Sequence, residues 1–120
     1  MARYVDGFVL PIARRNLAAY RRMARTAGRV WTEHGALEYR ETVGEDLKPK
    51  GMMATFPKTL RLRPRETVAF SWIVYKSRAH RDRVNKRVMK DKRIASMMGA
   101  NMPFDPKRML YAGFDVIVAM

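Results

Sequence analysis

The sequence predicts an α+β fold in which the elements follow the order βαββαβ. Four segments are rich in β-branched and aromatic residues and predict strands: 4–12, 36–44, 67–75 and 108–119. Two other segments repeat apolar residues at three- and four-residue spacing and predict helices: 14–33 and 78–90. At 120 residues the chain has the length of one domain, so we expect all six elements to share one core.

The first half of the chain supplies the longer helix. Its apolar residues are Leu17, Tyr20, Met23, Ala24, Ala27, Val30 and Trp31. The arginines of this segment occupy the opposite arc, which makes the helix amphipathic. The preceding strand, YVDGFVLPI, is expected to end at Pro11, because proline cannot donate a hydrogen bond to a sheet. Gly35 is expected to stop the helix before the strand at 36–44.

The second half begins with a long connection. Residues 44–66 contain three prolines and predict a loop that holds one short helical turn or an edge strand. After the third strand, Ser77 is a suitable N-cap for the helix at 78–90. One more helical turn is expected at 92–98, where Gly99 would end it.

This element order is that of a ferredoxin-like fold, a four-stranded antiparallel sheet with both helices on one face. A second face in contact with water would show alternating polar residues. The segment 68–75, VAFSWIVY, is instead apolar on both faces. We therefore expect a second copy of the chain to cover the helix-free face in a two-fold homodimer. The alternative is cover by the long connection, and the sequence leaves open which face holds Phe70 and Trp72.

Composition excludes several classes of site. The chain has no cysteine, which excludes disulfides, thiolate metal sites and cysteine nucleophiles. No apolar run approaches the ~20 residues of a membrane span, and the N-terminal segment lacks the pattern of a secretory signal. We therefore expect a cytoplasmic protein without a membrane contact.

The net charge of +14 is confined to two segments. Residues 14–29 carry six arginines and no acid, and residues 76–93 carry nine Lys or Arg against two acids. Both segments are largely predicted helix, whereas a sheet that binds RNA carries its aromatic and basic residues on the strands. We therefore interpret the charge as a solvated face and do not expect nucleic acid as a partner.

Three blocks of sequence are distinctive: YVDGFV at the start, FSWIVYKSRAHRD in the middle and MPFDPKRMLYAGF near the end. They resemble the bacterial YbaA-like family, a domain of unknown function within the dimeric α/β-barrel superfamily. The resemblance is less specific over 44–66, and Pro106 stands where glycine is usual. It implies a ferredoxin-like protomer and a two-fold dimer whose facing sheets enclose a cavity. Superfamily relatives include cofactor-independent monooxygenases and lactone isomerases, so the resemblance implies no single activity.

Asp6 and His34 are weak candidates for a catalytic role. Asp6 is a charged residue in an apolar strand, where burial would raise its pKa and make it a proton acceptor. The alternative is a hydrogen bond to backbone or to an arginine. His34 is placed either to act on a substrate near neutral pH or to cap the C-terminus of the first helix. His34 and His80 show no metal-ligand spacing, so we expect neither a metal nor a cofactor.

Ligand contacts are predicted from aromatic residues and from the turn before the last strand. The candidate walls are Phe8, Trp72, Phe104 and Tyr111. Their flat surfaces suit a planar ligand, and ordinary core packing is the alternative. Asp105 and Arg108 are the predicted ligand contacts in this turn. Arg108 would bind an anion bidentately, and the alternative is that the two residues form a turn-stabilising pair.

These expectations describe a homodimer that binds a small apolar or planar molecule in a sheet-lined cavity. Catalysis of the cofactor-independent monooxygenase or isomerase kind is one interpretation, with Asp6 as proton acceptor. A non-catalytic binding or regulatory module is the alternative. Nucleic-acid binding through the basic helices is the least favoured hypothesis.

Overall fold

The computed structural model describes residues 3–98 and 101–120. Its four strands are β1 (Tyr4–Ala13), β2 (Glu38–Val43), β3 (Glu66–Tyr75) and β4 (Leu110–Asp115). They form one sheet in the order β2-β3-β1-β4, and each neighbouring pair is antiparallel. The predicted α+β class with a four-stranded antiparallel sheet is therefore confirmed.

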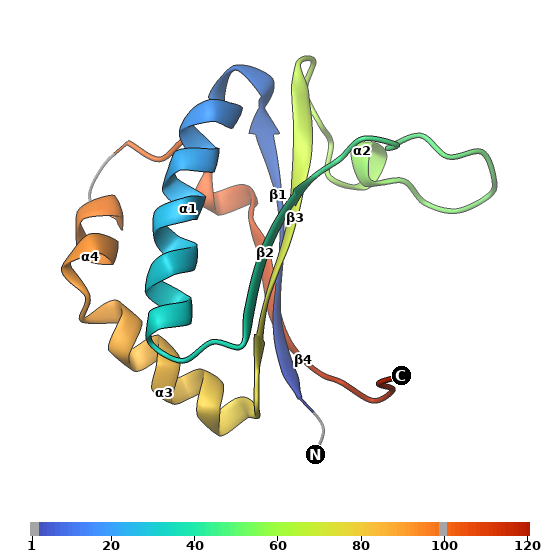
Figure 1. The fold of residues 1–120 in the computed structure, drawn as a ribbon. Coiled ribbons are helices and arrows are strands. Elements are labelled where there is room, and N and C mark those ends of the chain that lie inside the picture. Colours follow the sequence, from blue (N-terminus) through green and yellow to red (C-terminus); the bar gives the residue numbers. More distant parts are fainter. Residues whose placement is uncertain (1–2, 99–100) are drawn as a thin grey trace.

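Three helices lie together on one face of the sheet (Figure 1). They are α1 (Leu17–Glu33), which follows a short 3-10 turn, and α3 (Arg78–Met89) and α4 (Lys92–Met98), which follow β3. Gly99, which was expected to end the last of them, lies outside the described residues. Within the described ranges, no helix combines the length and apolar composition that crossing a membrane requires.

Local signals set the ends of these helices. Gly35 follows α1 with a φ of +118°, a left-handed conformation that favours glycine, so the predicted helix stop is confirmed. The Ser77 hydroxyl accepts a hydrogen bond from the His80 backbone N–H at 3.1 Å, which confirms the predicted N-cap of α3. The arginines of α1 are exposed, while its buried residues are Tyr20, Ala24, Ala27 and Val30.

The connection at 44–66 extends away from the three helices (Figure 1). It holds one short helix, α2 (Phe56–Thr59), which is the first of the two predicted alternatives, a helical turn or an edge strand. Thr55 caps this helix by accepting from the Lys58 backbone N–H at 3.4 Å.

Strand β1 does not end at Pro11, so this prediction was wrong. The strand continues to Ala13, and Pro11 pairs with Val68 of β3. Strand β4 pairs with β1 from Tyr4 to Val9, so within the described residues Pro11 has a strand neighbour on one side. A proline is tolerated at such a position because it misses no hydrogen bond on the open side.

Strand β3 has two unlike faces. Its buried face consists of Thr67, Ala69, Ser71, Ile73 and Tyr75. Ile73 belongs to the same core cluster as Val84 of α3, so this face lies under the helices. Phe70 and Trp72 alternate with the buried residues and therefore point away from the helices. The strand register therefore shows that Phe70 and Trp72 lie on the helix-free face, which the sequence had left open.

The helix-free face is apolar and open. Phe70 of β3 is 47% exposed, and Leu110 and Phe114 of β4 are each 56% exposed. Leu110 pairs with Val9 and Phe114 pairs with Val5, so the apolar surface continues from β3 across β1 to β4. None of the described helices α1, α3 and α4 packs on this face (Figure 1).

Candidate functional site

A cavity of about 420 Å³ lies between the helices and the sheet. All four strands contribute to it, together with α1, α3, α4 and the segment 102–109. The sequence placed a cavity on the helix-free side, between the facing sheets of a dimer. In the single chain the cavity is instead on the helix-covered side, because the strand register turns Asp6 and Phe8 toward the helices.

Most of the cavity wall is aromatic or thioether. The aromatic residues that line it are Phe8, Tyr20, Trp31, Tyr39, Phe104 and Tyr111. The methionines that line it are Met23, Met89, Met97, Met98, Met102 and Met109. Methionine side chains are flexible and polarizable, so this wall can adapt to the shape of an apolar ligand.

Asp6 supplies a carboxyl group to the cavity. It stands opposite Ile73 on the helix side of β1 and is 1% exposed. Its Oδ1 accepts a hydrogen bond from Arg81 Nη1 of α3 at 2.7 Å. Burial raises the pKa of Asp6 above its ordinary value, while the charge of Arg81 acts in the opposite direction. The arginine partner that the alternative interpretation required is therefore present.

Arg81 connects Asp6 to two tyrosines. Its Nη1 also donates to the Tyr111 hydroxyl at 2.7 Å, and its guanidinium lies 5.1 Å from the ring centroid of Tyr4. Tyr111 in turn stacks on Phe8, with ring centroids 5.0 Å apart. These contacts hold the Asp6 carboxylate in one orientation at the edge of an aromatic wall.

A second polar group, Asn85 of α3, fixes the indole of Trp31. Trp31 Nε1 donates to Asn85 Oδ1 at 3.0 Å, and the Tyr75 hydroxyl donates to the same oxygen at 3.3 Å. Trp31 also lies against Tyr39, with ring centroids 6.3 Å apart. The indole is therefore a positioned wall of the cavity.

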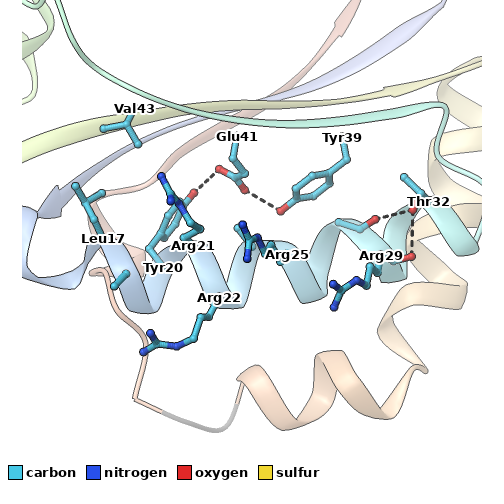
Figure 2. Close-up of a pocket in the computed structure, with 13 residues that line it drawn as sticks. Leu17, Tyr20, Arg21, Arg22, Arg25, Arg29, Thr32, Tyr39, Glu41 and Val43 are labelled. Carbon is cyan, nitrogen blue, oxygen red and sulfur yellow. Dashed lines mark hydrogen bonds between the residues drawn. The ribbon is translucent and has the colours of Figure 1, made fainter.

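Glu41 of β2 is held by two tyrosine hydroxyls (Figure 2). Tyr20 donates to Oε1 at 2.6 Å and Tyr39 donates to Oε2 at 2.7 Å. Burial, with the charge of Glu41 as the next cause, raises the pKa of both tyrosines, so both hydroxyls stay protonated as donors. We call these three residues the Glu41 clasp.

The Glu41 clasp also borders a second hollow on the outer side of α1 (Figure 2). This outer groove has a volume of about 1010 Å³ and runs between α1 and β2. Four exposed arginines line it: Arg21, Arg22, Arg25 and Arg29. The clasp residues line both hollows and separate the basic groove outside from the apolar cavity inside.

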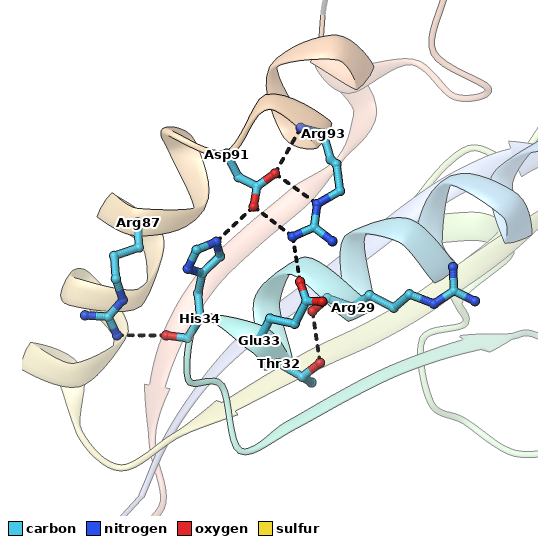
Figure 3. Close-up of polar contacts among 7 residues, drawn as sticks. All are labelled: Arg29, Thr32, Glu33, His34, Arg87, Asp91 and Arg93. Atoms are coloured by element: carbon cyan, nitrogen blue, oxygen red, sulfur yellow. Dashed lines mark hydrogen bonds and ion pairs between the residues drawn. The ribbon is translucent and has the colours of Figure 1, made fainter.

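His34 is not near Asp6. It occupies the C-cap position of α1, and its Nε2 lies 2.9 Å from Asp91 Oδ2, at the junction of α3 and α4. Arg93 bonds both Asp91 and Glu33, so this is a polar cluster at the surface (Figure 3). The bonds from Arg93, and next the bond from His34, lower the pKa of Asp91. His80 is also apart from the cavity, and its Nδ1 accepts from the Lys76 backbone N–H at 2.9 Å.

The remaining predicted residues lie outside the cavity. Trp72 is on the helix-free face, where its Nε1 donates to Glu38 at 2.9 Å. Asp105 caps a 3-10 turn by accepting from the Lys107 backbone N–H at 3.0 Å. Arg108 pairs with Glu66 at the start of β3 and not with Asp105. Its two terminal nitrogens donate to the two carboxylate oxygens of Glu66, at 2.6 and 3.0 Å.

The structure therefore brings together four of the predicted residues: Asp6, Phe8, Phe104 and Tyr111. It adds three polar side chains that sequence reasoning missed, namely Glu41, Asn85 and Arg81. The one available signal was the pair Tyr39 and Glu41, since residues two apart on a strand share a face. Within the described residues, no group of three or more His, Cys, Asp or Glu side chains is arranged to hold a metal ion.

Comparison with known proteins gives a consistent family relationship. A family model described as "Protein of unknown function (DUF1428)" matches residues 3–106. The uncharacterized protein YbaA of Escherichia coli K12 is 40% identical over 116 residues, which cover 97% of each chain. The YbaA protein of Shigella flexneri matches with the same identity and coverage. The resemblance seen in the sequence is confirmed: the chain belongs to the DUF1428 family, together with YbaA.

Proposed function

We propose that the protein is a cytoplasmic homodimer that binds a small, largely apolar or planar molecule in the cavity between α1, α4 and the sheet. The cavity itself is the observation that carries this proposal. Its volume of about 420 Å³ is in the range of small-molecule sites, and its wall is apolar with a few placed polar groups. A core that served packing alone would be expected to close such a space.

Asp6 is the group that orients the ligand in this proposal. Its raised pKa and its place beside Tyr111 suit it to accept a proton or a hydrogen bond from a bound molecule. Turnover of the monooxygenase or isomerase kind would use Asp6 as the proton acceptor, and a binding module would use it for orientation. Formation of a product from a bound compound distinguishes the two, because a binding module gives thermal stabilisation without product.

The helix-free face supports the homodimer. The strand order β2-β3-β1-β4 and the grouping of helices on one face agree with a ferredoxin-like protomer of the dimeric α/β-barrel kind. Exposed Phe70, Leu110 and Phe114 form a continuous apolar surface on the opposite face. A second copy of the same face would cover this surface in an isologous contact.

The two tryptophans allow a direct test of ligand binding. Trp31 lines the cavity and Trp72 lies on the other side of the sheet. In a titration with 2-naphthylmethanol, followed by ¹H–¹⁵N NMR, the indole signal of Trp31 should move and that of Trp72 should stay. Trp72→Phe assigns the two signals.

A matched pair of variants locates the binding site. Ala27→Leu places extra volume in the cavity and should abolish the shift of Trp31, whereas Ala18→Leu, exposed on the same helix, should leave it. A shift of Trp72 alone would place binding on the helix-free face and would contradict the proposal. The same conclusion would follow if Ala27→Leu and Ala18→Leu bound the probe equally.

A further inference from the structure

The cavity differs in charge from the rest of the protein. The chain carries 25 Lys and Arg and a net charge of +14. Among the described residues that line the cavity, however, none is Lys, Arg or His, and the charged ones are Asp6 and Glu41. A wall of this kind offers hydrogen-bond acceptors and negative charge, and it offers an anion no opposite charge.

The two carboxylates are not equivalent. Asp6 has the guanidinium of Arg81 at 2.7 Å. Glu41 has two neutral hydroxyl donors instead, and no ion pair joins it to a basic side chain in the described part of the chain. Glu41 is therefore the one of the two carboxylates without a direct ion pair, and the basic side chains that share a hollow with it are the exposed arginines of the outer groove.

Aromatic rings surround the Glu41 end of the cavity. Tyr20 and Tyr39 bond the carboxylate directly, and Trp31 lies 6.3 Å from Tyr39, centroid to centroid. Aromatic faces attract an organic cation through the negative charge of their π systems, and tryptophan is the strongest of them. A carboxylate among three such rings is a suitable environment for a protonated amine.

The strand register sets the distance between the two polar ends. Glu41 pairs with Ser71, and Ser71 pairs with Phe8, the neighbour of Asp6 on the same face of β1. Glu41 and Asp6 are thus separated by β3 and by two residues along β1, which places their backbones about 12 Å apart at a strand spacing of about 4.8 Å and a rise of about 3.4 Å per residue. The space between them is lined by rings and methionines, which suits a planar apolar body.

We propose that the cavity selects an organic cation, a primary amine on a planar apolar body, with the ammonium group beside Glu41, and that it rejects anions of the same shape. This inference rests on the proposed binding function. The arginines of the outer groove lie on the other side of the clasp and are exposed to solvent, so they attract anions there and not into the cavity.

Three probes of nearly equal shape test this selectivity: 2-naphthylmethylamine, 2-naphthylmethanol and 2-naphthoate. Affinities are read from the Trp31 indole signal of the full-length protein at neutral pH. The amine should bind about tenfold more tightly than the alcohol, as expected for a desolvated cation among aromatic rings. The carboxylate should leave Trp31 unshifted and should instead shift the Arg Nε–H signals of the outer groove.

A charge-removing variant locates the effect. Glu41→Gln keeps the shape and should reduce the advantage of the amine over the alcohol to about twofold or less. Glu45→Gln, which makes the same change at an exposed position, should leave the advantage intact. If Glu41→Gln fails to fold, the ranking of the three probes on the unaltered protein still tests whether the cavity prefers the amine.

The outcomes separate the two claims. Equal affinities for the three probes, or tightest binding of the carboxylate at Trp31, would overturn the cation selectivity and leave the binding function standing. No shift of Trp31 with any of the probes would overturn the binding function itself. Loss of the amine's advantage in both Glu41→Gln and Glu45→Gln would show that general surface charge, and not Glu41, causes it.

Discussion

Each face of the sheet holds some side chains that are unusual for their degree of exposure to solvent. The face under the helices holds Asp6, Ser71 and the bonded Glu41, while the face toward solvent holds Phe70, Leu110 and Phe114. Buried polar groups cost free energy unless they are bonded, and exposed apolar patches commonly mark contact surfaces. These differences agree with the proposed roles of the inner face in ligand binding and of the outer face in dimer formation, so changes on the two faces should have different effects.

The largest effect on stability is expected from Asp6→Ala on the inner face. This change leaves the nearly buried Arg81 guanidinium without its buried partner, which should lower the free energy of unfolding by about 3 kcal/mol. Asp82 bonds Arg81 Nε at 2.8 Å from an exposed position, so Asp82→Ala should cost about 0.5 kcal/mol or less. Urea denaturation measures both, and equal losses would show that burial of the pair has no special role.

The next effect is expected on the outer face, and it concerns assembly. Phe114→Glu puts a charge on the apolar surface and should weaken the proposed homodimer by about a hundredfold, with little change in secondary structure. Met52→Glu makes a comparable change on the exposed connection and should leave the dimer intact. Analytical ultracentrifugation reports the masses. An unaltered protein that sediments as a monomer at all concentrations would refute the dimer.

A smaller effect is expected from the Glu41 clasp. Tyr39→Phe removes one hydroxyl donor from a carboxylate and should lower the free energy of unfolding by about 1.5 kcal/mol. On the outer face, Trp72→Phe removes a donor from Glu38, whose side chain is 40% exposed, and should cost less, because water replaces the lost bond. Thermal or urea denaturation compares the two, and a greater loss in Trp72→Phe would contradict the ranking of the faces.

The smallest effect is expected in the dependence of stability on pH, where Asp6 and Asp91 act in opposite directions. The pKa of Asp91 is lowered by Arg93 and His34, so its contribution is present above its unfolded pKa and is lost as pH falls. The pKa of Asp6 is raised by burial, so as pH falls this carboxylate is protonated in the folded protein before it is protonated in the unfolded chain. Asp6 therefore adds to the stability of the folded state as pH falls. Denaturation between about pH 7 and pH 3 should show that Asp91→Asn reduces the acid-induced loss. Asp6→Asn should increase it. The same sign in both variants would contradict this assignment.

The sequence predicted the elements well because their signals are local. Apolar spacing located α1, Ser77 located the start of α3, and Gly35 located a left-handed turn. Pro11 was misjudged because the tolerance for proline depends on where β4 stops pairing, which is a property of the sheet and not of the strand.

The site was predicted in part, and the reason lies in the register. Phe8 and Tyr111 are 103 positions apart in the chain but directly opposite in the sheet, and no local pattern encodes that pairing. Trp72 was grouped with Asp6 although Asp6 pairs with Ile73, which places the two side chains on opposite faces. Arg81 was missed because its partner Asp6 lies in another element, and a basic helix offers many arginines that are equivalent in sequence.

The Glu41 clasp has a consequence for the speed of exchange. Tyr20, Glu41 and Tyr39 line both hollows, so the wall between the cavity and the outer groove is one layer of side chains thick at this point. Opening it requires the loss of two hydrogen bonds and a rotation of side chains, and it requires no displacement of α1. Side-chain rotation is faster than the movement of helices. A molecule bound as proposed should therefore be able to pass this wall without a change in the fold.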